Sequence, residues 1–172
     1  MKYFVALLLA VLFVLPMSGT AEEAFSLRNG YTWGMPKEKA LALAQEEGLG
    51  PNISQADSLL GFTDVSVGSF TASFFTMRFE NEKSRNQLNY ISYSFDGLPA
   101  EGELFLAIGA DLLDSLVSVY GECSSLIPGA YYGWVLPDTE VTLMRGPDFN
   151  GENLAKWSIV YAPVDRVKNG GF

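Results

Sequence analysis

Two carboxylates, Asp111 and Asp114, have the spacing that most readily suggests chemistry. They lie three positions apart and therefore share one face of a helix, and Glu101 and Glu103 lie just upstream. Paired carboxylates serve as acid and base in hydrolases, or they bind a divalent cation. On the polar face of a helix they are more often simply hydrated. We therefore expect no catalytic residue and no metal site here.

The segment 148–153 (Asp-Phe-Asn-Gly-Glu-Asn) superficially resembles a calcium loop. It lacks the repeated Asp and Asn ligands and the distal bidentate Glu that close such a loop. Its Gly and Asn content is typical of a loop between two strands. The sequence therefore predicts neither a metal nor a cofactor.

The richest aromatic cluster is Tyr131-Tyr132-Gly133-Trp134. Along a strand, Tyr131 faces one side of the sheet while Tyr132 and Trp134 face the other. An exposed Tyr and Trp surface would suit a glycan or a protein partner. The alternative is that these rings pack under a helix or a loop. We take Tyr131, Tyr132 and Trp134 as candidate binding residues.

Trp33 is the fourth candidate binding residue, and it precedes Gly34 and Met35. Gly34 permits a positive φ or a close backbone approach. Trp33 and Met35 would then cover the end of the following helix and the edge of the sheet. This packing role is the alternative to ligand contact by Trp33.

Hydrophobic periodicity predicts two helices and six strands. The helices are predicted at 36–47 and 103–120, where Gly48 and Gly121 supply the stops. The strands are predicted at 59–67, 69–79, 88–95, 131–136, 140–144 and 155–162, with turns at 81–86 and 96–99. Strand 69–79 has large side chains on both faces, so it is buried on both sides or carries a bulge.

The order helix, three strands, helix, three strands indicates an α+β fold with two helices packed on an antiparallel sheet. We interpret it as two pseudo-repeated α-β-β-β units, at about 30–97 and 100–163. Both belong to one domain that spans 22–172.

Residues 1–21 are predicted to be a secretory signal peptide. A positive start at Lys2 precedes the apolar run from Phe4 to Leu15, and cleavage is expected near Ala21. A helix of that run would rise only about 18 Å, too short for a hydrocarbon core of roughly 30 Å. The protein is therefore expected to be secreted or periplasmic, with no stable membrane insertion after the leader is removed.

The composition excludes several classes of site. The 172 residues include no histidine and one cysteine, which excludes a Ser-His-Asp or Cys-His nucleophile, a histidine-ligated zinc and an intrachain disulfide. Cys123 is expected to be buried, or to pair with another chain. The net charge of −9 makes nucleic acid and anionic lipid poor partners.

The segment Leu27–Ala40 (LRNGYTWGMPKEKA) resembles the opening of small bacterial envelope proteins of the small-protein-A type, the outer-membrane assembly lipoproteins. It is also similar to the modules of secreted β-lactamase-inhibitor proteins. Leu116–Gly121 resembles the ending of such modules, a helix followed by an aromatic residue and glycine. The resemblance implies helices packed on an antiparallel sheet, used for protein–protein contact, with no catalytic residues to carry over.

We therefore predict an exported, non-enzymatic protein that binds an unknown protein partner through the face or the edge of its sheet. The alternatives are an envelope hydrolase that uses carboxylates alone and a glycan-binding module that uses exposed Tyr and Trp rings.

Overall fold

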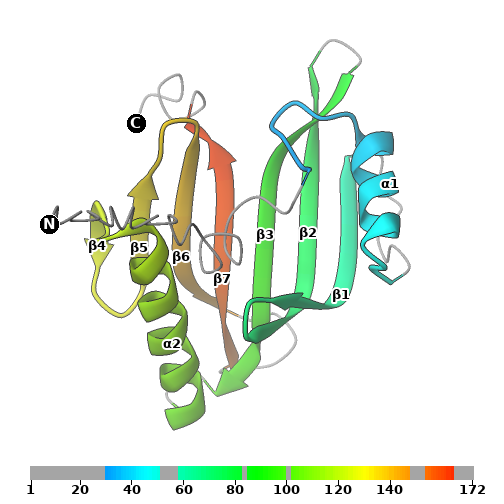
Figure 1. Cartoon of the computed structure of the whole chain (residues 1–172). Helices are drawn as coiled ribbons and strands as arrows, with labels where there is room; N and C mark the ends of the chain where they lie inside the picture. Colours follow the sequence, from blue (N-terminus) through cyan, green and yellow to red (C-terminus); the bar gives the residue numbers. More distant parts are fainter. Residues whose placement is uncertain (1–29, 51–57, 83–84, 100–101, 148–153, 165–172) are drawn as a thin grey trace, which may run out of the picture.

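The computed structural model describes residues 30–50, 58–82, 85–99, 102–147 and 154–164, which form two helices and seven strands (Figure 1). In chain order these are α1 (Lys37–Glu46), β1 (Leu59–Val67), β2 (Phe70–Glu82), β3 (Arg85–Pro99), α2 (Glu103–Tyr120), β4 (Ser125–Ile127), β5 (Tyr131–Val135), β6 (Thr139–Pro147) and β7 (Leu154–Pro163). The predicted signal peptide, Glu101 and the loop 148–153 lie outside the described residues.

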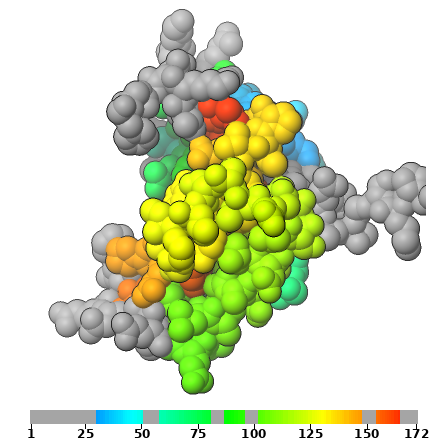
Figure 2. Space-filling view, turned by 90° about the vertical axis from the view of Figure 1, so that its left-hand side faces the viewer, coloured from blue at the N-terminus to red at the C-terminus, as the bar shows by residue number. Residues whose placement is uncertain are grey.

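The strands form one antiparallel sheet in the order β1-β2-β3-β7-β6-β5-β4. The neighbouring strands β3 and β7 are the last strands of the two successive meanders, and β7 is the central strand of the sheet. Both helices lie on the same side of the sheet, as Figures 1 and 2 show from perpendicular directions. The α+β prediction is thereby confirmed. No helix in the described ranges is long and apolar enough to cross a membrane.

The helix predictions agree closely with the structure. α1 ends in a Schellman motif, in which the Gly48 and Leu49 amides donate to the carbonyls of Gln45 and Ala44 and Gly48 has a φ of 73°. Pro36, predicted inside the helix, instead precedes it with an extended ψ of 146°. The reason is that Pro36 forms a β-bridge with Gln87 on β3.

Three strand predictions need correction. β4 was missed because three residues, Ser-Leu-Ile, carry too little periodicity to predict a strand. The turn predicted at 96–99 is wrong, since β3 continues through a register shift and pairs Leu98 with Ala155 and Pro99 with Leu154. The turn predicted at 81–86 is shorter, because β2 extends to Glu82 and β3 begins at Arg85.

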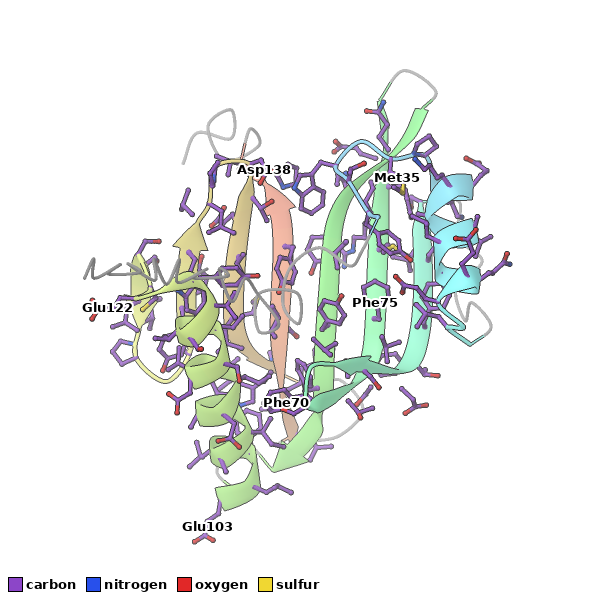
Figure 3. The ribbon with its side chains drawn as sticks, in the orientation of Figure 1. Met35, Phe70, Phe75, Glu103, Glu122 and Asp138 are labelled. Carbon is purple, nitrogen blue, oxygen red and sulfur yellow. The ribbon has the colours of Figure 1, made fainter. Side chains whose placement is uncertain are left out.

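The two-sided burial of β2 has a local cause. Asp64 on β1 has a φ of 55°, and the β1–β2 pairing skips Asp64 and Ser73 without changing register. The buried face therefore switches there, from Phe62 to Val65 along β1. Beyond this point the strand ends bend toward β3, and Phe70 packs edge-on against Phe95 with ring centroids 6.1 Å apart (Figures 1 and 3).

α2 packs directly on β7 through Gly109. The Trp157 indole lies against this glycine, stacks on Phe105 with centroids 5.4 Å apart, and donates to the Phe105 carbonyl at 3.0 Å. Leu112 and Leu116 continue the buried stripe of the helix. On the side of the sheet that carries the helices, Phe75 lies between α1 and α2 in the view of Figure 3 and stacks on Tyr93, with ring centroids 4.8 Å apart.

Candidate functional site

The face of the sheet opposite the helices, here called the open face, carries a candidate binding surface. Because side chains alternate along each strand, the register identifies which residues share this face. One row crosses all seven strands in sheet order: Thr63, Phe74, Ser94, Ser158, Met144, Tyr131 and Ile127. The row runs from one edge of the sheet to the other, so a partner lying across it would contact every strand.

The neighbouring row on the open face consists of small residues. In sheet order it contains Gly61, Thr76, Ser92, Val160, Thr142, Gly133 and Ser125. At Gly133 a Cβ would lie 3.4 Å from the Tyr131 ring, so that ring occupies the space above the glycine. Ser92 and Thr142 in this row are buried, so the accessible part of the face is mainly the neighbouring row of larger side chains.

Large apolar side chains are exposed on four strands of the open face, β2, β4, β5 and β6. Phe74, Met144, Ile127 and Val135 are between 39% and 64% exposed. The other large, exposed apolar side chains are divided between α2 and the helix-side surface of β4: Leu104, Leu106, Val117 and Leu126. Among the described residues, the open face thus holds four of the eight large, exposed apolar side chains, and it carries them on the strands of the sheet.

Arg78 and Tyr90 form a cationic and aromatic pair at one end of the open face. They are directly paired across β2 and β3, and the Arg78 guanidinium carbon lies 4.7 Å from the Tyr90 ring centroid. A hollow of about 640 Å³ adjoins the pair. Neither residue was predicted as a binding residue from the sequence, although an arginine inside an apolar strand followed by a tyrosine on the next strand was the available signal.

The candidate residue Trp33 lies at the end of the sheet where β3 and β7 diverge. Its segment pairs with β3, because the Gly34 amide donates to the Leu88 carbonyl and the Leu88 amide donates to the Met35 carbonyl, both at 2.8 Å. The Trp33 indole then reaches β6 and donates to the Thr139 hydroxyl at 2.9 Å. Trp33 therefore ties the two halves of the sheet together.

A second hollow, of about 520 Å³, lies beside Trp33. Its walls include Tyr31, Pro137 and Pro163, with Asp138 at its rim (labelled in Figure 3). The Asp138 carboxylate accepts from the Thr139 hydroxyl at 2.9 Å. This hollow is separate from the open face.

The aromatic cluster on β5 is divided between the two faces. Tyr131 lies on the open face, where it joins the row with Met144. Tyr132 and Trp134 lie on the helix side, and Trp134 is only 2% exposed, with its indole donating to the Gly121 carbonyl at 2.8 Å. Tyr132 is half-buried and accepts from the Gly129 amide at 3.0 Å. The placement of Trp134 in a binding surface is therefore corrected, because α2 covers its ring.

The helix carboxylates do not converge. Glu103, Asp111 and Asp114 are all exposed to solvent along α2. Within the described ranges, no group of three or more Asp, Glu, Cys or His side chains could hold a metal ion. Cys123 is half-buried, with its thiol free of any disulfide within the described chain, so its predicted burial is only partial.

One buried phenol is electrostatically perturbed. Burial raises the pKa of Tyr161 well above its usual range, and the neighbouring hydroxyls of Tyr120 and Tyr93 raise it further. Tyr161 therefore stays neutral as part of the core, on the helix side of β7. It contributes no charge to the open face.

Comparison of this chain with family models, with characterised proteins and with solved structures finds no match.

Proposed function

We propose that the protein is an exported, non-enzymatic binding protein, and that the open face of its sheet is the surface that binds a protein partner. The observation that carries the proposal is the row of directly paired residues from Thr63 to Ile127, which includes the exposed side chains of Phe74 and Met144. Protein interfaces combine apolar and polar groups, and this face has both. The sequence pattern of the leader supports export.

We further infer that the units at about 30–97 and 100–163 are pseudo-repeats. What supports this is the sheet order, in which each helix precedes a meander and the last strands of the meanders, β3 and β7, pair with each other. The predicted α-β-β-β pattern fits the first unit, whereas the second has four strands, β4 to β7. The proposed surface would then be built jointly by both units. A partner that spans the β3–β7 junction would contact residues of each.

Protein binding is favoured over glycan binding by the position of the tryptophans. Trp134 and Trp157 are buried, and Trp33 is half-buried and hydrogen-bonded. A flat platform for sugar rings requires exposed aromatic faces. The open face instead offers scattered apolar groups among hydroxyls, which suits an irregular protein surface better than a sugar ring.

A charge placed on the open face tests this proposal. The double variant Phe74→Asp, Met144→Asp is expected to abolish recovery of the partner when the mature protein is used for affinity capture from its own cell envelope. Both side chains are already exposed, so we expect the fold to survive. The readout is the amount of each co-purifying protein, with circular dichroism to check folding.

Leu104→Asp is the matched control, because Leu104 is an exposed apolar residue on α2. It is expected to leave recovery unchanged. If the double variant and Leu104→Asp lost partner recovery equally, or if both retained it, the partner would contact a surface other than the open face. Hydrolysis of a glycan or peptide panel in the absence of any partner would favour the enzyme instead.

A further inference from the structure

The hollow beside Arg78 is part of the open face. Its walls include Leu59, Arg78, Glu80, Asn89, Tyr90 and Ala162. It lies at the register shift between β2 and β3, where Arg78 pairs with Tyr90 but the next residue, Phe79, pairs with Leu88. Asn89 is therefore the extra residue of a β-bulge. Bulges change the direction in which neighbouring side chains point, and they are frequent next to functional sites.

Arg78 is held in place without using its hydrogen-bonding capacity. Its guanidinium lies over the Tyr90 ring, with 4.7 Å between the guanidinium carbon and the ring centroid. Within the described part of the chain, this stacked guanidinium makes no ion pair and no side-chain hydrogen bond, and Arg78 is exposed. Stacking orders the side chain in advance, so less entropy is lost when its donors find an acceptor.

The chemistry of the hollow selects among anions. The planar guanidinium matches a carboxylate through two parallel N–H···O bonds. The chain has a net charge of −9, so a phosphate or another multiply charged anion would meet more repulsion than a singly charged one. A singly charged carboxylate meets the least repulsion, and the apolar surface of Leu59 and Ala162 would shield its contact from water.

Arg78 is also continuous with the proposed docking surface. Thr76 precedes it on the same face of β2, and Tyr90 stands beside Ser92 on β3. Arginine and tyrosine are enriched among the residues that dominate protein-binding energy. Besides Arg78, Lys156 is a basic side chain on this face, near the opposite end of the strands.

We propose that Arg78, stacked on Tyr90, binds an aspartate or glutamate side chain of the protein that docks on the open face. This inference rests on the proposed function and adds the chemistry of the partner: an acidic residue at one end of its contact surface.

The first test is direct and needs no partner. We would titrate the protein with acetyl-Ala-Glu-Ala-amide and with its Gln counterpart, and follow the Arg78 Nε–Hε signal by NMR. The expected result is a saturable shift with an affinity that is about twofold to fivefold weaker for the Gln peptide, as for an exposed ion pair. Arg78→Gln should abolish peptide binding, and Lys156→Gln should retain it. Equal affinity for both peptides, no shift, or binding that survives in Arg78→Gln would overturn the assignment.

The second test separates this inference from the proposed function. In affinity capture, Arg78→Gln is expected to lower partner recovery about tenfold, while Lys156→Gln is expected to leave it unchanged. If Phe74→Asp, Met144→Asp abolishes capture but Arg78→Gln does not weaken it, the docking face stands and the carboxylate contact is wrong. If the wild-type protein captures no partner, the proposed function fails, and the partner assignment fails with it.

Discussion

Leu112→Ala is expected to lower the free energy of unfolding by about 2–5 kcal/mol. Leu112 is fully buried, at 0% exposed, in the stripe by which α2 packs on the sheet. Removing its isobutyl group loses transfer free energy and leaves a cavity, because the flanking Phe105 and Leu116 are themselves fixed in the core. The midpoint of chemical denaturation, measured with the m-value, gives the change directly.

Leu104→Ala is the internal control for that measurement. The residue type and the helix are the same, but Leu104 is 63% exposed, so we expect a change of less than about 0.5 kcal/mol. Similar losses in the two variants would mean that the packed face of α2 is assigned incorrectly.

Gly109→Ala is expected to destabilise the protein by about 1–3 kcal/mol, although alanine is the better helix former. A Cβ at this position would overlap the Trp157 ring and lie 2.6 Å from its Nε1 atom. The indole cannot withdraw, because it is stacked on Phe105 and donates to the Phe105 carbonyl. The helix would have to move away from β7, and the Trp157–Phe105 hydrogen bond would lengthen. Thermal unfolding and the Trp fluorescence of the folded state report both effects.

Gly146→Ala is the matched substitution for Gly109→Ala. A Cβ there meets nothing within 4 Å, so we expect a change of less than about 0.5 kcal/mol. If Gly109→Ala were as mild, the close approach of α2 to Trp157 would not exist.

The helices were predictable because their signals are local. The apolar stripe from Phe105 to Leu116 and the stop at Gly121 are set by residues of the helix itself. The bend at Asp64 was not predictable, because a positive φ at an aspartate depends on how the strand ends fold back toward β3. β4 was missed for a related reason, since its three residues become a strand only by pairing with β5.

The candidate site was predictable only in part. Tyr131 was selected from the sequence and lies on the open face. Periodicity showed that β5 has two faces, but it could not show which of them would be covered by α2. Because α2 covers the face that carries Trp134, this side chain is buried in the core. Trp33 was considered either a packing residue or a ligand contact, and its bond to Thr139 is a contact between residues 106 positions apart. The Arg78–Tyr90 pair depends on the strand register, which the sequence alone did not specify.

Site-specific photo-crosslinking most directly tests whether the open face is the docking surface. A benzophenone amino acid would replace Met144 on the open face and, in a separate variant, Leu106 on α2; both native side chains are exposed. We expect a discrete protein adduct from position 144 in the cells that make the protein, with none from position 106. Adducts from position 106 at an equal or higher yield, or none from position 144, would contradict it.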